Sequence, residues 1–324
     1  MVALGSGVVW CVAPALPHVM SGGIEGVSYA EPTSDAERAA NASWATRELR
    51  FVPASADASP PSHLTPKELE SYNQRGFVLP AKPVLSRVEA QWHGDIWQSL
   101  YDKYGEQGNG FSINGFFKRF GECFDLVAHR NVVQLARDTL GTQHVACWGA
   151  HYVCKLPHHD SDLEFHQDGV LWPFSATRNC SIWVALDDVD QGNGATEFFA
   201  GSHLLGGLHR LRREGDDHTI QQPTLARLRA ECPLVPASLQ AGFASVHSDL
   251  TAHLSMGPNT SDRRRLGITI SFCPMDQGVQ NCVGSQWASS SFIPPGAVLC
   301  EPWTRLERPP DCALQGRGPT RAQL

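Results

Sequence analysis

The residues in this chain best suited to metal chemistry are His166 and Asp168, an imidazole and a carboxylate two positions apart. If they lie on a strand, period-two geometry directs both side chains to the same face of a sheet. One further histidine would complete three adjacent ligands for a divalent iron and leave three octahedral positions for oxygen chemistry. His253, 87 residues further along, is the candidate third ligand. A histidine satisfied within the core is the alternative for this residue.

The His-x-Asp spacing occurs four times in the chain, so the tripeptide alone does not identify the site. Pair 93/95 lies among apolar residues at helical spacing, where residues two apart diverge, and we expect it to be exposed. Pair 158/160 lies in a Pro-led polar cluster typical of a loop. Pair 247/249 precedes His253 too closely for a clamp built from three strands, and a helix start capped by Ser248 or Asp249 is an equal alternative there. Only pair 166/168 opens a long β-like stretch.

Composition narrows the class of protein. The chain has 324 residues, 42% of them hydrophobic, enough to bury the core of one large or two modest domains. A net charge of −7 argues against a nucleic-acid-binding surface, and the three arginines at 263–265 are typical of a solvated strand entry. Ten cysteines without any C-x-x-C spacing exclude zinc ribbons and thioredoxin-like motifs and favour reduced thiols.

Targeting signals are not evident at either end. The first twenty residues are apolar but are interrupted by glycines and prolines, and no Lys or Arg precedes Arg38. This pattern disfavours a signal or transit peptide. The sequence has no uninterrupted run of about 20 apolar residues for a membrane span, and it ends without a peroxisomal Ser-Lys-Leu address. We therefore expect a soluble, cytoplasmic protein.

Composition also divides the chain into three parts. Residues 1–62 are rich in Ala, Ser, Gly and Pro and are expected to form a disordered extension. Residues 63–308 are expected to form the folded domain, and residues 309–324 an irregular tail. Near the start of the domain, Thr65 is followed by Pro and, three residues on, Glu, which predicts a helix with a capping box. Gly76 is expected to end this helix before a strand.

The periodicity changes from helical to β along the domain. Residues 84–140 have helical spacing with Gly141 as a stop, and the core candidates are Leu126, Val127, Val133, Leu135 and Leu140. From His144 onward, short β-branched and aromatic runs, including 164–172 and 243–250, are separated by turn signals. A helical first part followed by about eight short strands predicts a mainly β fold, a jelly roll (double-stranded β-helix, cupin-like) with N-terminal and flanking helices packed on one sheet.

In combination, these motifs resemble the phytanoyl-CoA dioxygenase family of iron(II)- and 2-oxoglutarate-dependent oxygenases. The segments that carry the resemblance are HQDGVLWPF, SIWVALDDVDQGNG, GSH and HLSMGPNTSDRRRLGITISF. Upstream, LTPKELESYNQRGFVLP is similar to the family's opening helix and strand, and WGAHYVCKLP to the strand before the iron strand. The resemblance covers roughly residues 64–305.

The resemblance implies a ligand set and two cosubstrates. His166, Asp168 and His253 would bind Fe(II), with 2-oxoglutarate and O2 as cosubstrates. Arg265 would bind the far carboxylate of 2-oxoglutarate, because a guanidinium offers two parallel hydrogen bonds to a carboxylate. On strand 265–272, Arg265 shares the small, polar face, whereas Arg264 does not. The stretch 253–259 is one residue longer than in the family; a bulge could absorb it, and Arg264 stays a competitor.

Three further residues match cosubstrate-contact positions of the family. Ser255 matches a serine that helps to hold the carboxylate, Trp183 matches an aromatic wall of the pocket, and His151 falls near a contact position. An exposed turn serine is the alternative for Ser255, and plain core packing is the alternative for Trp183. We expect a structural turn at 201–203 and a solvated loop at 209–218, for which a mobile lid over the substrate is the alternative.

The implied reaction is hydroxylation of an unactivated C–H bond in a small or lipid-like metabolite, with succinate and CO2 as co-products. Asp168 favours hydroxylation, because related halogenases have Gly or Ala at this position. The residues that indicate an apolar or aromatic-walled substrate site are Val170, Leu171, Trp172 and Phe174. Two alternatives stay open: a cupin-type metalloenzyme that does not use 2-oxoglutarate, and a non-catalytic member of the fold.

Overall fold

The structure is a computed structural model of the chain. The residues that it describes are 8–10, 49–55, 60–104, 112–114, 116–118, 120–158, 163–172, 178–208, 220, 224–255 and 259–275. The predicted extension 1–62 lies outside them except for 8–10, 49–55 and 60–62. The predicted tail 309–324 and the predicted loop 209–218 lie wholly outside them.

The folded part opens with the predicted capping box. The Thr65 hydroxyl accepts the Glu68 N–H at 3.2 Å, and the Glu68 carboxylate accepts the Thr65 N–H at 2.7 Å, at the start of α2 (Pro66–Arg75). Gly76 ends the helix with φ 82°, a left-handed conformation that costs glycine little. Strand β2 (Phe77–Val78) follows. The predictions for this segment are confirmed.

Helices precede the main strands, as predicted. They are α3 (Arg87–Tyr104), η1 (Phe116–Lys118), α4 (Gly121–Val127) and α5 (Arg130–Leu140). All five predicted core residues of this region are buried, and Gly141 caps α5 in the left-handed conformation. The predicted exposure of His93 is wrong: it lies between the core residues Ala90 and Trp97 on one stripe of α3, and burial lowers its pKa to about 3.

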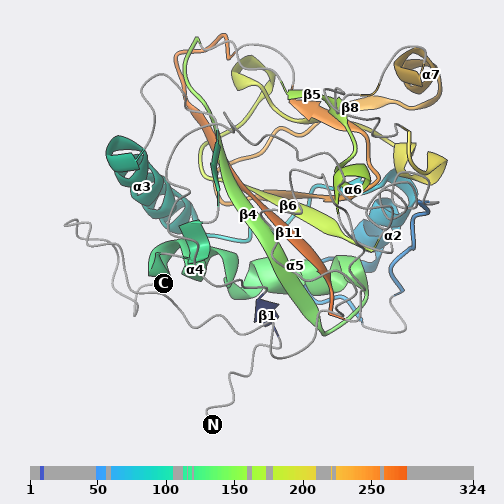
Figure 1. Ribbon diagram of the computed structural model, residues 1–324, viewed down its shortest axis with the longest axis horizontal. Helices are drawn as coiled ribbons and strands as arrows, with labels where there is room; N and C mark the ends of the chain where they lie inside the picture. The colour runs from blue at the N-terminus through green and yellow to red at the C-terminus, as the bar shows by residue number, and fades with distance from the viewer. Residues whose placement is uncertain are drawn as a thin grey trace, which may run out of the picture.

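Two facing sheets contain the described strands (Figure 1). In the described residues the larger sheet has seven strands, which are β1 (Val8–Trp10), β4 (Val145–Lys155), β11 (Arg265–Pro274), β6 (Cys180–Ala185), β9 (Ala244–Ser248) and β2 in order, with β3 (Ser112–Asn114) also paired to β4. The smaller sheet has four, which are β5 (Leu163–His166), β10 (His253–Ser255), β7 (Glu197–Phe199) and β8 (Leu234–Pro236). Described strand pairs are antiparallel except β1 with β4. This is the predicted jelly-roll architecture.

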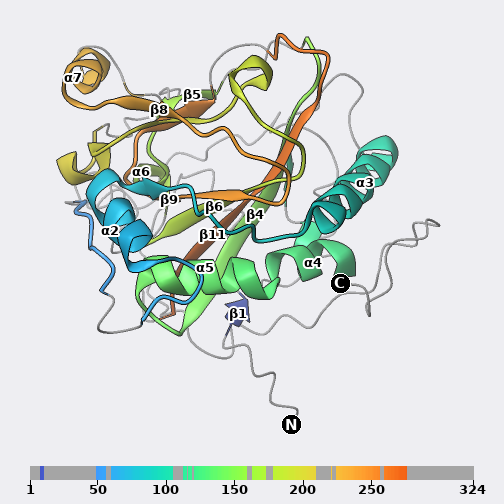
Figure 2. The ribbon, with the colours of Figure 1, turned by 180° about the vertical axis from the view of Figure 1, so that it is seen from behind.

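The main core lies between the larger sheet and the helices. Figure 2 shows α5 and α4 along one side of this sheet, and the smaller sheet lies across its other side. The predicted apolar face of β11 enters this core through Leu266, Ile268, Ile270 and Phe272. Burial of one such side chain contributes about 1.5–3 kcal/mol. The opposite face of β11 therefore points to the space between the sheets.

The remaining described elements are short. They are η2 (Gln191–Asn193), η3 (Ser202–Leu205) and α7 (Thr224–Glu231). The predicted structural turn at 201–203 is confirmed, because the Ser202 hydroxyl accepts the Ala252 N–H at 2.9 Å and the buried His203 hydrogen-bonds the Asn73 carbonyl at 3.0 Å. The six described cysteines are buried as thiols. Within the described part of the chain, none of the helices combines the length and the apolar character needed to cross a membrane.

Candidate metal centre

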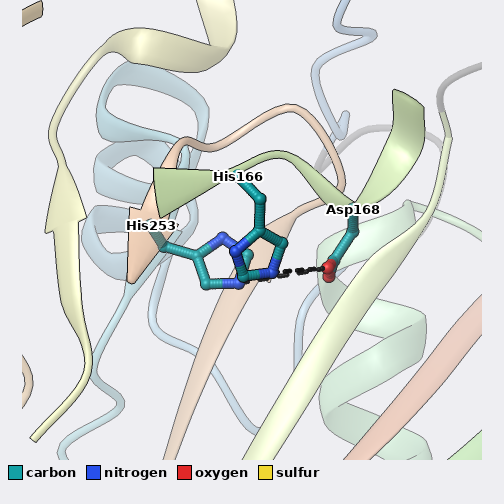
Figure 3. A group of neighbouring side chains, drawn as sticks. All are labelled: His166, Asp168 and His253. Atoms are coloured by element: carbon teal, nitrogen blue, oxygen red, sulfur yellow. Dashed lines mark ion pairs between the residues drawn. The ribbon is translucent and has the colours of Figure 1, made fainter. Parts of the chain in front are cut away.

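His166 and His253 meet through the pairing of two short strands. Strand β10 runs antiparallel to β5, and the register places His253 directly opposite His166. Their ring centroids lie 4.3 Å apart, and Figure 3 shows both rings turned toward Asp168. Two histidines 87 residues apart in the sequence thus become neighbours on one face of the smaller sheet.

Asp168 reaches the same face by a different route from the one predicted. Strand β5 ends at His166, and Asp168 opens the short helix α6 (Asp168–Leu171), so the predicted continuous strand through 164–172 is wrong. Gln167 nevertheless keeps an extended backbone, with φ −122° and ψ 126°. Because alternation holds through Gln167, His166 and Asp168 still project to the same side.

Buried polar contacts fix this turn from strand to helix. The Gln167 amide nitrogen donates to the carbonyls of Leu250 (2.6 Å) and Gly206 (2.9 Å). The Gly169 N–H donates to the Asp249 carbonyl at 2.7 Å, and a Cβ at Gly169 would lie 3.0 Å from the Asp249 side chain. These long-range contacts start the helix at Asp168, where the local apolar pattern favours a strand.

The three side chains are arranged as metal ligands. One nitrogen or oxygen from each of His166, Asp168 and His253 lies within 4.8 Å of the others. Asp168 Oδ1 is 3.5 Å from His166 Nε2 and 4.0 Å from His253 Nε2. His253 Nδ1 donates to the Thr251 carbonyl at 2.9 Å, so its Nε2 lone pair faces the other two ligands. The Thr251 hydroxyl in turn donates to the Gly76 carbonyl at 2.6 Å.

The electrostatics favour the metal-binding protonation states. Burial alone would raise the pKa of Asp168, but hydrogen bonds with His166 and His247 hold that pKa well below its ordinary value. Burial lowers the pKa of His253 far below its ordinary value, and the neighbouring imidazoles lower it further. At neutral pH the centre therefore offers a charged carboxylate and a neutral His253, the forms that bind a divalent metal.

Arg265 is buried near this centre with an incompletely paired charge. Its side chain is 1% exposed, and Nη2 donates to the Thr196 hydroxyl at 2.9 Å. Its Nε and Nη1 are buried and have no hydrogen-bond partner among the described residues. Burial lowers the pKa of Arg265 to about 10. The guanidinium lies 4.6 Å from the centroid of the Trp183 ring. Since a buried unpaired charge is costly, this cation is suited to an incoming anion.

Arg264, the competitor, already has a counter-ion. Its Nε and Nη2 donate to the two carboxylate oxygens of Asp187 at 2.9 and 3.1 Å, and Nη1 donates to Gln98 at 2.9 Å. Arg263 is exposed and paired with Asp190. The expectation of a solvated arginine run therefore holds for Arg263 alone, because strand alternation sends its two successors to opposite faces.

The chain matches known proteins over most of the described domain. The family model for phytanoyl-CoA dioxygenase (PhyH) matches residues 60–267, more than half of the chain. The chain belongs to the phytanoyl-CoA dioxygenase family. This family consists of Fe(II)- and 2-oxoglutarate-dependent oxygenases. The resemblance drawn from the sequence motifs is confirmed.

Curated relatives are about a quarter identical to the chain within the aligned region. Phytanoyl-CoA dioxygenase domain-containing protein 1 of Bos taurus is 27% identical over 184 residues, which cover 54% of this chain and 59% of the relative. Phytanoyl-CoA dioxygenase of Arabidopsis thaliana is 26% identical over 157 residues, with coverage of 48% and 51%. The aligned region thus spans between half and three fifths of these relatives.

Solved structures share the fold. EctD from S. alaskensis with 2-oxoglutarate and 5-hydroxyectoine has a TM-score of 0.65 at 15% identity. The match covers 81% of this chain and 94% of the EctD chain. The α-ketoglutarate-dependent carbocyclase SnoK from nogalamycin biosynthesis has a TM-score of 0.60 at 22% identity, with coverage of 78% and 98%. The epimerase SnoN, solved with Fe3+ and α-ketoglutarate, has a TM-score of 0.60 at 20% identity, with coverage of 74% and 96%.

The other residues that match the family lie on the strands around the centre. Trp183 is 6% exposed and covers Gly267, where its ring takes the space of a Cβ. His151 lies opposite Thr269 on the neighbouring strand; burial lowers its pKa, and the charge of Asp168 opposes that shift. Ser255 closes β10, but its side chain lies outside the described residues. Their roles toward a cosubstrate stay predictions.

Sequence reasoning missed two residues of this centre, Ser181 and His247. Both contact Asp168: the Ser181 hydroxyl at 2.8 Å and His247 Nε2 at 3.3 Å. The helix-start alternative for 247/249 is wrong, because His247 lies within strand β9. The β-like pattern of 243–250 was the available signal. The pairing partner of that strand could not be identified from it.

Proposed function

We propose that this chain is an Fe(II)- and 2-oxoglutarate-dependent dioxygenase that hydroxylates an unactivated C–H bond of a small, apolar metabolite. One observation carries the proposal: three convergent metal-ligand side chains and an incompletely paired, buried arginine both line the space between the sheets. Membership of the phytanoyl-CoA dioxygenase family supports the same chemistry.

His166, Asp168 and His253 would hold the iron. The donor set fits the metal, because two neutral imidazoles and one carboxylate suit Fe(II) and cancel half of its charge. Bound iron would supply the activation of O2 that is coupled to decarboxylation of 2-oxoglutarate to succinate and CO2. The contribution of the chain is to orient the ligands, as Thr251 orients His253. It also keeps bulk water away, since the three ligand side chains are only 8–17% exposed.

Arg265 would bind the far carboxylate of 2-oxoglutarate. Two of its guanidinium nitrogens, Nε and Nη1, have no partner among the described residues, so the side chain keeps N–H donors for a carboxylate. Thr196, which contacts Arg265, immediately precedes β7, and β7 pairs with β10 through Glu197 and Leu254. Strand β10 therefore connects His253, at the metal centre, to the strand that follows Thr196, the partner of Arg265. Two residues of extended chain span about 6.6 Å, which is comparable to the length of a short dicarboxylate such as 2-oxoglutarate.

Asp168 supports hydroxylation as the outcome. Its carboxylate supplies a third protein ligand at the position where a halogenating relative would leave room for a halide. Its low pKa keeps this ligand charged at neutral pH. A hydroxyl group returned to the substrate carbon is therefore the expected product.

An aromatic wall supports an apolar substrate. The β4–β11 register pairs Gly149 with Ser271 and Cys147 with Phe272, which makes Trp148 the extra residue of a β-bulge. Trp148 packs edge-to-face on Trp172, four residues after Asp168, with ring centroids 4.7 Å apart. Bulges often redirect one side chain beside an active site, and two indoles here would favour a hydrocarbon-rich or aromatic substrate.

The proposal is tested by anaerobic reconstitution with Fe(II) and 2-oxoglutarate, followed by admission of O2 and measurement of succinate. Candidate apolar metabolites are then screened for an added oxygen. Wild type should release succinate, whereas His166→Ala and Arg265→Met should not. The matched control is Arg264→Ala, which should retain turnover because Asp187 already neutralises Arg264.

The same assay separates the two alternatives. A cupin-type metalloenzyme that does not use 2-oxoglutarate would bind iron but release no succinate. A non-catalytic member of the fold would not bind Fe(II) stoichiometrically under anaerobic conditions. Either result would contradict the proposed dioxygenase.

A further inference from the structure

The two oxygens of the Asp168 carboxylate have different surroundings. Oδ1 faces the imidazoles of His166 and His253, at 3.5 and 4.0 Å (Figure 3). Oδ2 instead accepts a hydrogen bond from the Ser181 hydroxyl at 2.8 Å and contacts His247 Nε2 at 3.3 Å. One oxygen is therefore turned toward the other ligands, and the second is held from the opposite side.

Ser181 and His247 are neighbours across two strands of the larger sheet. Strands β6 and β9 are antiparallel, and their register places His247 directly opposite Ser181. Directly opposite residues have Cβ atoms about 4.5–5.5 Å apart on one face of a sheet. Both residues are buried, with 0% and 4% exposure. Two residues of the larger sheet thus hold Asp168, which follows strand β5 of the smaller sheet.

The hydrogen-bond chemistry assigns the protons of this pair. An ionised carboxylate only accepts, so Ser181 and His247 must both be the donors. The His247 proton is accordingly assigned to Nε2, while His247 Nδ1 has no partner among the residues that the structure describes. Ser271 lies 3.5 Å from the Ser181 oxygen and can donate to it, because the single Ser181 hydrogen is engaged with Asp168.

We propose that Ser181 and His247 are positioning residues that restrict Asp168 to coordination through Oδ1 alone. With Oδ2 held by two donors, the carboxylate cannot rotate to give both oxygens to one metal ion. A one-oxygen ligand keeps a further coordination position open for cosubstrate or O2. This inference rests on the proposed function, because it requires a metal in the centre.

Direct coordination by His247 is the competing explanation. Its ring centroid lies 4.3 Å from that of His253, close enough to raise the question. Its Nε2, however, is directed at Asp168 Oδ2 and not at the group of ligand atoms formed by His166, Asp168 and His253. A positioning residue and a ligand respond differently to conservative substitution, which an experiment can measure.

The experiment titrates the aerobically stable ions Mn(II) and Co(II) into wild type, His247→Ala, His247→Gln and Ser181→Ala. Free Mn(II) is followed by electron paramagnetic resonance, and bound Co(II) by its d–d absorption, which depends on coordination number. Loss of a hydrogen-bonding partner of a metal ligand typically costs 10- to 100-fold in affinity. We expect about this loss for His247→Ala, with a changed Co(II) spectrum, and recovery of most affinity in His247→Gln, whose amide can still donate. Ser181→Ala should change the spectrum in the same direction.

The control is His203→Gln, which alters another buried histidine that hydrogen-bonds a backbone carbonyl outside this centre. It should bind Mn(II) like wild type, and circular dichroism should show that every variant is folded. If wild type binds and His247→Ala has the same affinity and spectrum, the positioning role is refuted. If both His247 variants lose binding equally, His247 is a ligand and the inference is also wrong. If wild type binds neither ion, the proposed function fails and this inference falls with it.

Discussion

The two faces of β11 lie in opposite chemical environments. On the helix side, the side chains are large and apolar and are at most 1% exposed, as for Leu266, Ile268, Ile270 and Phe272. On the side facing the smaller sheet, they are small and polar apart from one cation, as for Arg265, Gly267, Thr269 and Ser271. The apolar face packs in the main core and stabilises the fold, whereas the other face presents small side chains and one buried cation to the space between the sheets.

Two adjacent arginines show this difference most clearly. The Arg264 guanidinium donates two hydrogen bonds to the Asp187 carboxylate. It also stacks over Trp97, with 5.2 Å from the guanidinium to the ring centroid. Arg265 is more deeply buried and has two nitrogens without a partner among the described residues. Burial of an unpaired charge destabilises a fold and is retained where function uses it. Arg264 is therefore paired within the fold, whereas Arg265 is the arginine that we propose binds the cosubstrate.

The largest expected effect concerns the helix side. Phe272→Ala removes a fully buried ring from the main core and should destabilise the protein by about 3–5 kcal/mol. Urea denaturation followed by circular dichroism measures this change. Ser271→Ala, on the other face of the same strand, is the control and should cost much less. A loss below about 1 kcal/mol for Phe272→Ala would mean that this face is not the stabilising one.

The second prediction is that Arg265→Met weakens cosubstrate binding while it stabilises the ligand-free protein. Arg265→Met should weaken 2-oxoglutarate binding by about 2–5 kcal/mol, roughly 30- to 5000-fold in Kd. The same variant should raise the melting temperature of the ligand-free protein, because an apolar chain replaces a buried charge that lacks a counter-ion among the described residues. Titration calorimetry on the Mn(II)-loaded protein and scanning calorimetry measure the two effects. A lower melting temperature with unchanged affinity would contradict the assignment.

The third prediction uses two glycines on the site side of neighbouring strands. In Gly267→Ala, the new methyl group would overlap the Trp183 ring, and overpacking of this kind costs about 1–3 kcal/mol. The displaced indole should raise the KM for 2-oxoglutarate. Gly149→Ala is the matched control, since a Cβ there meets no described atom within 4 Å. Equal effects of the two substitutions on KM would show that Trp183 does not wall the cosubstrate site.

The smallest effect is expected for Arg264→Ala. Loss of its half-buried pair with Asp187 should destabilise the protein by about 1 kcal/mol, and the affinity for 2-oxoglutarate should not change. Chemical denaturation and the same titration measure these quantities. If Arg264→Ala and Arg265→Met weaken cosubstrate binding equally, the alternation of β11 does not determine which arginine binds 2-oxoglutarate.

The features that depend on adjacent residues could be predicted from the sequence. The capping box at Thr65 and the glycine stop at Gly76 involve contacts within one helix, so a few neighbouring residues determine them. The alternation of β11 likewise needs only the strand itself, and it predicted that Arg264 and Arg265 lie on opposite faces; which of them binds a cosubstrate stays a prediction. The family motifs added the link between His166 and His253, which local pattern alone could not supply.

The features that depend on long-range register could not be predicted. Asp168 opens a helix because Asp249 receives the Gly169 N–H, a contact across 80 residues. His247 enters the centre because β9 pairs with β6 in one particular register, which places it opposite Ser181. A shift of one residue would turn His247 to the other face of the sheet. Nothing within 243–250 specifies that register.

Gly76, which ends α2 in the left-handed conformation, connects that helix to the metal centre. Its carbonyl receives the Thr251 hydroxyl and the Ser248 N–H, and Thr251 sets the tautomer of His253. Any β-carbon at position 76 would collide with the Thr251 and His203 side chains. A shortened chain beginning after Gly76 would keep His166, Asp168 and His253 yet lose the carbonyl that holds Thr251 beside His253.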